Sequence, residues 1–175
     1  MKAIHAFFVL FLIGFVVSCS SVYGVRYDYD KQADFENLKT YDWMTVPEKA
    51  NINSLNVERV KKAVSAELQA KGLIMTSNNP DFLIAEHLGR KDKVQVMNWG
   101  YGYGPHGGYR GAGGISTYQY EEGSLILDFV DAKSKKMIWR GVAKADINNV
   151  DTPEKKEKLI NEAVHEILKN FPPKP

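Results

Sequence analysis

The sequence predicts an α+β fold: a two-layer sandwich with a mainly antiparallel sheet and two helices on one face. Five segments alternate apolar and polar residues, as half-buried strands do, and two repeat apolar residues every three or four positions, as amphipathic helices do. Their order along the chain is β-β-α-β-β-β-α. Short connections between strands favour antiparallel pairing, and one apolar stripe per helix favours packing of both helices on the same sheet face.

The predicted strands are alternating runs bounded by turn residues. Tyr41 and Trp43 share one face of the second strand, and both Trp43 and Trp139 are expected in the core. Val25, Tyr27 and Tyr29 share the apolar face of the first strand. The strands are expected at residues 25–30, 40–44, 82–88 with a continuation toward Trp99, 115–131, and 137–147, where Met137 and Trp139 should face the same way.

The first predicted helix covers residues 57–71, with Asn56 as its N-cap and Gly72 in the left-handed conformation after its end. The second opens with Thr152 as the cap and Pro153 in the first helical position. Its apolar face is expected to reach Phe171, before the prolines at 172 and 173 end it. The two apolar stripes consist of Val57, Val60, Val64 and Leu68 and of Leu159, Ile160, Ala163, Val164, Ile167, Leu168 and Phe171.

The N-terminus has the pattern of a lipoprotein signal peptide. Lys2 gives a positive start, and residues 6–17 form an apolar run that is shorter than the roughly 20 residues of a membrane-spanning helix. The run ends in Val16-Val17-Ser18-Cys19, which resembles a lipobox, with a small residue before the thiol that accepts the lipid. We predict cleavage between Ser18 and Cys19 and lipidation of Cys19, the only cysteine of the chain.

These features divide the chain into a signal peptide (1–18), a lipidated N-terminus with a short tether (19–24) and one periplasmic domain (25–172). Two or three acyl chains would anchor the protein stably, because each buried CH₂ contributes about 0.8 kcal/mol. Ser20, where an aspartate would favour the inner membrane, favours the outer membrane in a Gram-negative host. We therefore expect a lipid-anchored protein of the cell envelope that faces the periplasm.

The charge balance argues against a nucleic-acid partner. The chain has 23 basic and 21 acidic residues, a net charge of +2, and removal of the signal peptide takes away only Lys2. Electrostatic capture of nucleic acid needs a marked basic excess, which is missing here. A hydrophobic content of 44% and a charged content of 25% are ordinary values for one folded domain.

A glycine-rich segment at residues 98–114 holds eight of the 14 glycines. It opens no helix and has no Gly-Lys-Ser/Thr sequence, so nucleotide binding is not expected. One interpretation is a plain hairpin tip. The other is a binding loop, in which aromatic side chains beside a guanidinium stack on sugars or contact a partner protein. The residues of that loop would be Trp99, Tyr101, Tyr103, Tyr109 and Arg110.

No set of residues predicts a catalytic or metal site, and no cofactor is expected. His87, His106 and His165 lack the spacing of metal ligands, and no serine lies in a nucleophile elbow. Paired carboxylates could act on a glycan. However, the acidic residues near the fourth strand are better explained by turns beside Gly123 and at the hairpin; they are Glu121, Glu122, Asp128 and Asp131.

Several patches resemble the hallmarks of a family of bacterial lipoproteins, the domain-of-unknown-function 4136 family. They are the run Asp34-Phe35-Glu36-Asn37-Leu38-Lys39-Thr40-Tyr41-Asp42-Trp43, then Pro80-Asp81-Phe82, Glu122-Gly123-Ser124-Leu125-Ile126-Leu127-Asp128, Asp131-Ala132-Lys133 and Trp139-Arg140-Gly141. Leu38 stands where the family pattern has tyrosine, a difference expected to change packing only. The resemblance spans the mature chain and implies an α+β envelope lipoprotein, without implying catalytic residues.

Three functions are compatible with these features. The first is a non-catalytic binding or structural module that contacts another envelope protein or the cell wall, with the aromatic loop as the contact. The second is a hydrolase of cell-wall glycan or peptide, and the third is a carrier of a small apolar ligand between sheet and helices. The predicted anchor and the missing catalytic set favour the first.

Overall fold

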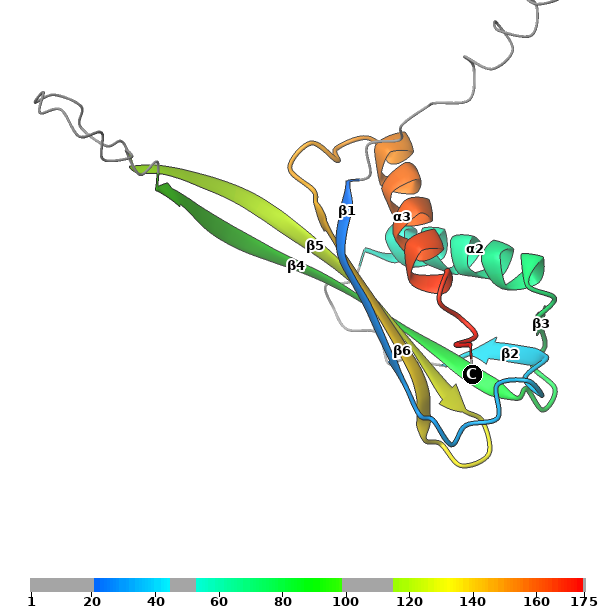
Figure 1. Cartoon of the computed structure of the whole chain (residues 1–175). Coiled ribbons are helices and arrows are strands. Elements are labelled where there is room, and N and C mark those ends of the chain that lie inside the picture. Colours follow the sequence, from blue (N-terminus) through cyan, green and yellow to red (C-terminus); the bar gives the residue numbers. More distant parts are fainter. Residues whose placement is uncertain (1–20, 45–52, 99–114, 175) are drawn as a thin grey trace, which may run out of the picture.

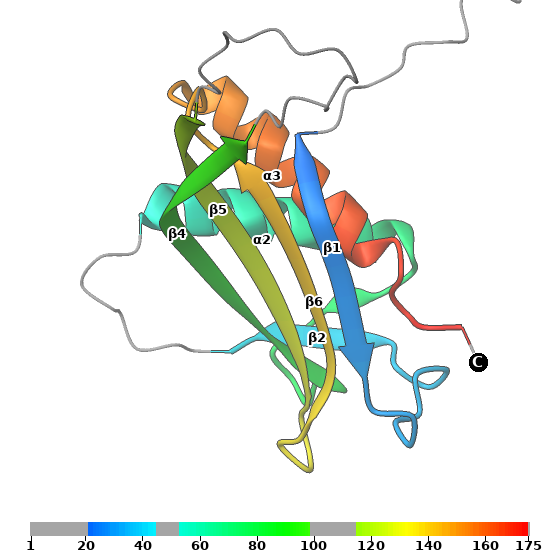
Figure 2. The same cartoon turned by 60° about the vertical axis from the view of Figure 1, so that its left-hand side comes forward.

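The computed structural model describes residues 21–44, 53–98 and 115–174. Six strands form one sheet in the order β1-β6-β5-β4-β2-β3. Helices α2 (Ser54–Ala70) and α3 (Pro153–Leu168) cover one face of it, as Figures 1 and 2 show. The predicted two-layer α+β fold is therefore confirmed. Within the described residues, no helix is long and apolar enough to cross a membrane.

The centre of the sheet is antiparallel. Strands β1 (Val22–Tyr29), β6 (Met137–Asp146), β5 (Ile115–Asp131) and β4 (Phe82–Asn98) pair as antiparallel neighbours. Strand β2 (Thr40–Trp43) joins β4 in parallel, and β3 (Ile74–Met75) joins β2 in parallel. The sequence pattern missed β3 because two residues are too few to show an alternation.

Strand β1 begins three residues earlier than the alternation indicated. Gly24 has a φ of 59° and lies at a register shift between Tyr23 and Arg26, so the alternation is broken there. The predicted apolar face is also less buried than expected, since Val25 is 36% and Tyr27 46% exposed. Both side chains lie on an edge strand of the sheet.

The start of α2 differs from the prediction. The helix begins at Ser54 and its N-cap is Asn53, whose side-chain oxygen accepts the N–H of Asn56 at 3.4 Å. Asn56 therefore lies inside the helix, because Asn53 already supplies a capping acceptor one turn earlier. The end is as predicted: Gly72 has a φ of 83°, and the N–H of Leu73 donates to the carbonyl of Leu68 at 2.9 Å.

Helix α3 starts as predicted and ends earlier. The Thr152 hydroxyl oxygen accepts the N–H of Lys155 at 3.3 Å, and Pro153 follows the cap. The helix ends at Leu168, so Phe171 lies beyond it and not on its apolar face. Phe171 is nevertheless only 2% exposed, because the chain after the helix folds back into the core.

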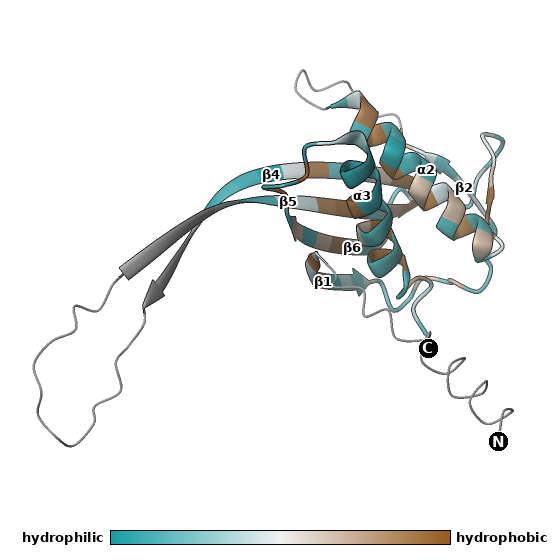
Figure 3. Ribbon diagram, turned by 90° about the horizontal axis from the view of Figure 1, so that it is seen from above, coloured by the Kyte–Doolittle hydropathy of each residue, from teal (hydrophilic) through white to brown (hydrophobic). Residues whose placement is uncertain are grey.

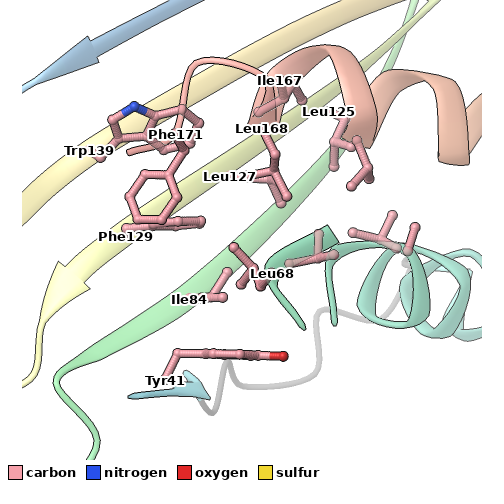
Figure 4. Packing of buried hydrophobic residues seen from close by; sticks show 14 of the residues in the cluster. Tyr41, Leu68, Ile84, Leu125, Leu127, Phe129, Trp139, Ile167, Leu168 and Phe171 are labelled. Carbon is pink, nitrogen blue, oxygen red and sulfur yellow. The ribbon is translucent and has the colours of Figure 1, made fainter. Parts of the chain in front are cut away.

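The core lies between the sheet and the two helices, as Figure 4 shows. The Phe171 ring contacts those of Phe129 and Trp139, with centroids 4.5 and 5.3 Å apart. Trp139 is fully buried, as predicted, whereas Trp43 is partly buried beneath the Lys61 ammonium.

Met137 is 47% exposed and does not share the face of Trp139. A register shift between Phe129 and Val130 adds one residue to β6, which reverses the alternation there.

Candidate binding site

The residues predicted to carry function lie outside the described part of the chain. These are Ser18 and Cys19 at the predicted lipidation site and Trp99, Tyr101, Tyr103, Tyr109 and Arg110 in the glycine-rich segment. What the structure does show is the strand that follows the first segment and the two strands that flank the second. Strand β1 starts three residues after Cys19, and β4 and β5 lead to and from residues 99–114.

Strands β4 and β5 extend well beyond the rest of the sheet (Figure 1). Figure 3 shows from above the two helices that cover the body of the sheet. On one side β2 pairs with β4 only as far as Ile84, and on the other β6 pairs with β5 only to Glu122. Ile147 and Asn148 still bond to Glu121. From Glu121 toward Ile115, β4 and β5 pair only with each other among the described residues. We call residues 93–98 and 115–120 the arm. At about 3.4 Å per residue, it is about 17 Å long.

A groove of about 640 Å³ lies at the base of the arm, between the sheet and the N-terminal ends of both helices. Its floor is apolar, with Leu88, Leu125, Ala143 and Ala145 from three adjacent strands. One wall is the α3 surface made by Leu159, Ile160 and Ala163.

Polar groups form the rim of the groove. Arg90 and Glu121 bind each other across β4 and β5. The Glu121 contact raises the pKa of the Arg90 guanidinium, so Arg90 carries its charge at any physiological pH. Asn53 and Lys156 line the groove from the first turns of α2 and α3. The groove therefore combines an apolar interior with polar and charged lining residues of both signs.

A buried carboxylate connects β1 to the base of the arm. Glu122 on β5 is 9% exposed and accepts the Tyr23 hydroxyl of β1 at 3.0 Å. The ammonium groups of Lys144 on β6 and Lys93 on β4 lie 3.3 and 3.6 Å from its other oxygen. Burial works to raise the pKa of Glu122, but the bonds from Tyr23 and the two lysines outweigh it and lower the pKa. Burial and the Glu122 bond raise the pKa of Tyr23.

A second ionic cluster lies on the sheet face away from the helices. Leu127 and Phe129 are buried on the helix side, so Asp128 between them points the other way. Its two carboxylate oxygens accept Nε and Nη2 of Arg140 at 2.5 and 2.6 Å, and His87 Nε2 lies 3.2 Å from one of them. Within the described residues, no helix packs on this face.

The turn interpretation of the acidic residues is correct only for Asp131. Its carboxylate accepts the Ser134 N–H at 2.6 Å, which closes the β5–β6 hairpin. Glu121, Glu122 and Asp128 instead lie inside β5 and make ion pairs, and Gly123 is also within the strand. Because residues 121 and 128 are an odd number apart on a regular strand, their side chains lie on opposite sheet faces and do not line one cleft.

The two described histidines each have an acidic partner. His87 contacts Asp128, and His165 Nδ1 lies 2.9 Å from Glu67 of the other helix. In the part of the chain that the structure covers, no three His, Cys, Asp or Glu residues are grouped as metal ligands. His106 lies in the segment outside the described residues.

The fold and the groove define the class: a two-layer α+β domain with both described helices on one sheet face and a groove between the sheet and those helices. The family model of the domain of unknown function DUF4136 matches residues 25–173. The chain therefore belongs to the DUF4136 family, as the hallmark patches suggested. No curated protein sequence matches the chain.

Solved structures resemble this chain at low identity. A PDZ domain protein from Parabacteroides distasonis superposes with a TM-score of 0.60 at 14% identity, over 88% of this chain and 36% of that one. This chain thus corresponds to about a third of that protein, and the likeness shows the fold alone. PelC from Paraburkholderia phytofirmans, which crystallised as a dodecamer, gives a TM-score of 0.47 at 11% identity, over 84% of this chain and 94% of PelC.

Proposed function

We propose that this protein is a lipid-anchored, non-catalytic binding module of the cell envelope, and that the arm and the segment at its tip contact another envelope component. The observation that carries the proposal is the arm itself. Two strands continue for six residue pairs, from Lys93 opposite Tyr120 to Asn98 opposite Ile115, with no third strand beside them in the described residues.

Such an arm adds little to the stability of the domain. A two-stranded hairpin is at best marginally stable in water without a sheet or helix to pack on. The buried core residues lie elsewhere, between the body of the sheet and the two helices. An arm that contains none of the described core residues and leads to a segment rich in aromatic residues is well suited to contact a partner.

The proposed anchor supports the same function. Lipid on Cys19 would hold β1 within three residues of the membrane, and Glu122 ties β1 to the base of the arm. The arm would then project from a fixed point at the membrane surface. The predicted outer-membrane location rests on Ser20 and a Gram-negative host.

The test compares the full-length lipidated protein with an arm-shortened variant, in which an Asn-Gly turn joins Lys93 directly to Tyr120. Membranes are solubilised gently, and the native mass of the complex that contains each protein is measured. We expect the full-length protein in a complex larger than the arm-shortened variant forms. A complex of equal composition with and without the arm would refute a role of the arm in binding.

Two controls accompany this test. Lys133→Glu changes the hairpin at the other end of β5, and it should leave the complex intact because that hairpin is not part of the arm. Cys19→Ser should lose labelling by radioactive palmitate and keep its signal peptide, because cleavage at the lipobox depends on the lipidated thiol. Palmitate labelling that persists in this variant would contradict lipidation of Cys19, whatever the arm does.

A further inference from the structure

The groove at the base of the arm has the size and lining of a site for a small ligand. Its volume of about 640 Å³ lies within the usual range for such sites, which is about 300–1,000 Å³. Most ligand sites are largely apolar and have a few polar groups that fix the orientation of the ligand. This groove likewise has an apolar floor and a few polar lining residues.

Small side chains keep the floor open. Ala143 and Ala145 occupy successive inward positions of β6, and Ala163 faces them from α3. Larger residues at these positions would fill the space between sheet and helix. Gly123 has no room for a side chain, since a Cβ there would lie 2.8 Å from Ile147. The apolar floor of the groove is bounded by Leu159 and Ile160 of α3.

The rim indicates what kind of apolar ligand fits. The lining includes the cationic residues Arg90, Lys144 and Lys156 and the acidic residues Glu121 and Asp151, beside Asn148. Asp151 pairs with Lys155, and Lys144 pairs with Glu122. No carboxylate among the described residues pairs with Lys156, whereas Arg90 is paired with Glu121. An amphiphile with an apolar chain and a polar or anionic head would bury its chain on the floor and leave the head at the rim.

The chain itself indicates where such a ligand comes from. Val22, the first residue of β1, pairs with Ala145, which lines the groove. Cys19 precedes Val22 by three residues, a reach of at most about 10 Å. If Cys19 carries the lipid, as proposed above, this end of the sheet lies at the bilayer surface, and the groove lies beside it.

We propose that the groove binds an acyl chain of a lipid drawn from the membrane in which the protein is anchored. The placement at the membrane rests on the proposed lipid anchor, whereas the size and lining of the groove do not. The acyl chain would lie on Leu125, Ala143 and Ala145, with the lipid head near Arg90 and Lys156.

The test uses full-length lipidated protein in vesicles of phosphatidylethanolamine and phosphatidylglycerol that contain a phospholipid with a diazirine in its acyl chain. After illumination, peptide mass spectrometry locates the labelled residues. We expect labels on β6 and α3 around Ala145 and Leu159. Labels confined to β1, or no label on the groove residues, would overturn the proposal. The groove residues would also stay unlabelled if the protein's own acyl chain on Cys19 filled the groove, which would likewise exclude a lipid drawn from the membrane.

Two variants and their matched controls make the result specific. Ala163→Leu should fill the groove and lower its labelling by about tenfold; Ala70→Leu makes the same change at an exposed position at the end of α2. Leu159→Asn should lower labelling by making the wall polar, and its control is Leu55→Asn, at a residue that is 64% exposed. Unchanged labelling in both groove variants, with thermal unfolding showing that they fold, would also overturn the proposal.

Vesicle co-sedimentation separates this inference from the proposed function. Protein that fails to sediment with the vesicles indicates that the anchor is wrong. Protein that sediments but takes no label in the groove indicates that the groove inference is wrong while the anchor stands.

Discussion

Asp81 joins two of the family's hallmark patches. One oxygen of its carboxylate accepts the N–H groups of Lys39 and Thr40 at 2.9 and 2.8 Å and the Thr40 hydroxyl at 2.8 Å. This arrangement fixes the start of β2 against the start of β4, where Tyr41 stacks on Phe82 with centroids 5.9 Å apart. The pattern Pro80-Asp81-Phe82 therefore reflects the parallel pairing of β2 with β4 and not a chemical site.

Replacement of Asp81 should weaken the fold in a pH-dependent way. The Lys39 N–H bond chiefly lowers the pKa of Asp81, so its contribution to stability is complete above the unfolded pKa near 4 and is lost as pH falls through the lower folded pKa. We expect Asp81→Ala to lower the free energy of unfolding by about 2 kcal/mol at pH 7. Urea titrations between pH 2 and 7 measure this. A variant that loses stability in acid as steeply as the wild type would contradict it.

Gly141 belongs to another hallmark patch and is required by close packing. A Cβ at this position would lie 2.3 Å from Trp139 and 2.4 Å from Ile167. We therefore expect Gly141→Ala to destabilise the protein by about 2 kcal/mol, because the buried indole or α3 must move. Thermal unfolding of this variant and of Ala70→Leu measures the difference. Equal stability of the two variants would show that the contact is easily relieved.

The hallmark patches could be found in the sequence, but their meaning could not. Trp139 was predictable as a core residue from strand alternation, and it is buried. The partners of Asp81, Glu122 and Asp128 were not predictable, since each lies on a strand that is distant in sequence. Glu122 beside Gly123 looked like a turn because nothing local shows that β5 continues through both residues.

At the scale of elements, the arm should be dispensable for folding. Beyond Lys93 and Tyr120, which the arm-shortened variant keeps, its strands pair only with each other in the described sheet, so their removal exposes none of the described core. We expect the arm-shortened variant to unfold within about 3 °C of the wild type. Differential scanning calorimetry of both proteins measures this. A fall in the unfolding temperature of much more than about 3 °C would mean that the arm packs on the domain and is not a projecting element.

The Glu122 cluster should hold the first strand in place. In Glu122→Ala, Tyr23 loses its bond to the carboxylate, and we expect faster hydrogen exchange in the peptide that spans residues 22–29. The control is Glu121→Ala, which removes the neighbouring ion pair with Arg90 but no bond to β1. Equal exchange in the two variants would show that the strand ladder alone holds β1.

Element boundaries were less predictable than element types. Helix α2 starts one turn earlier than expected because Asn53, and not Asn56, provides the cap, and both are good capping residues. The order of the strands depends on contacts between β1 and β6, which lie more than 100 residues apart, so no local pattern contains it. A ligand site between sheet and helices was one of the three compatible functions, but the residues of the groove were not predictable, since it requires the ends of both helices and three strands together.

At the scale of the whole molecule, the described ion pairs and hallmark residues stabilise the fold, and two features are left for function. One is the groove, which lies close to the proposed anchor. The other is the arm, which leads to the aromatic, glycine-rich segment. Both lie toward the end of the sheet where β1 begins, so a lipid on Cys19 would hold them near the membrane (Figure 1).

The measurement that tests the central claim most directly is photocrosslinking in living cells. A photoreactive amino acid replaces Tyr109 in the segment between the arm strands, in the full-length lipidated protein, and Lys133 in the opposite hairpin serves as the control position. We predict one dominant crosslinked envelope partner from position 109 and none from position 133. Equal crosslinking from both positions, or none from position 109 above background, would contradict a function of the arm in binding.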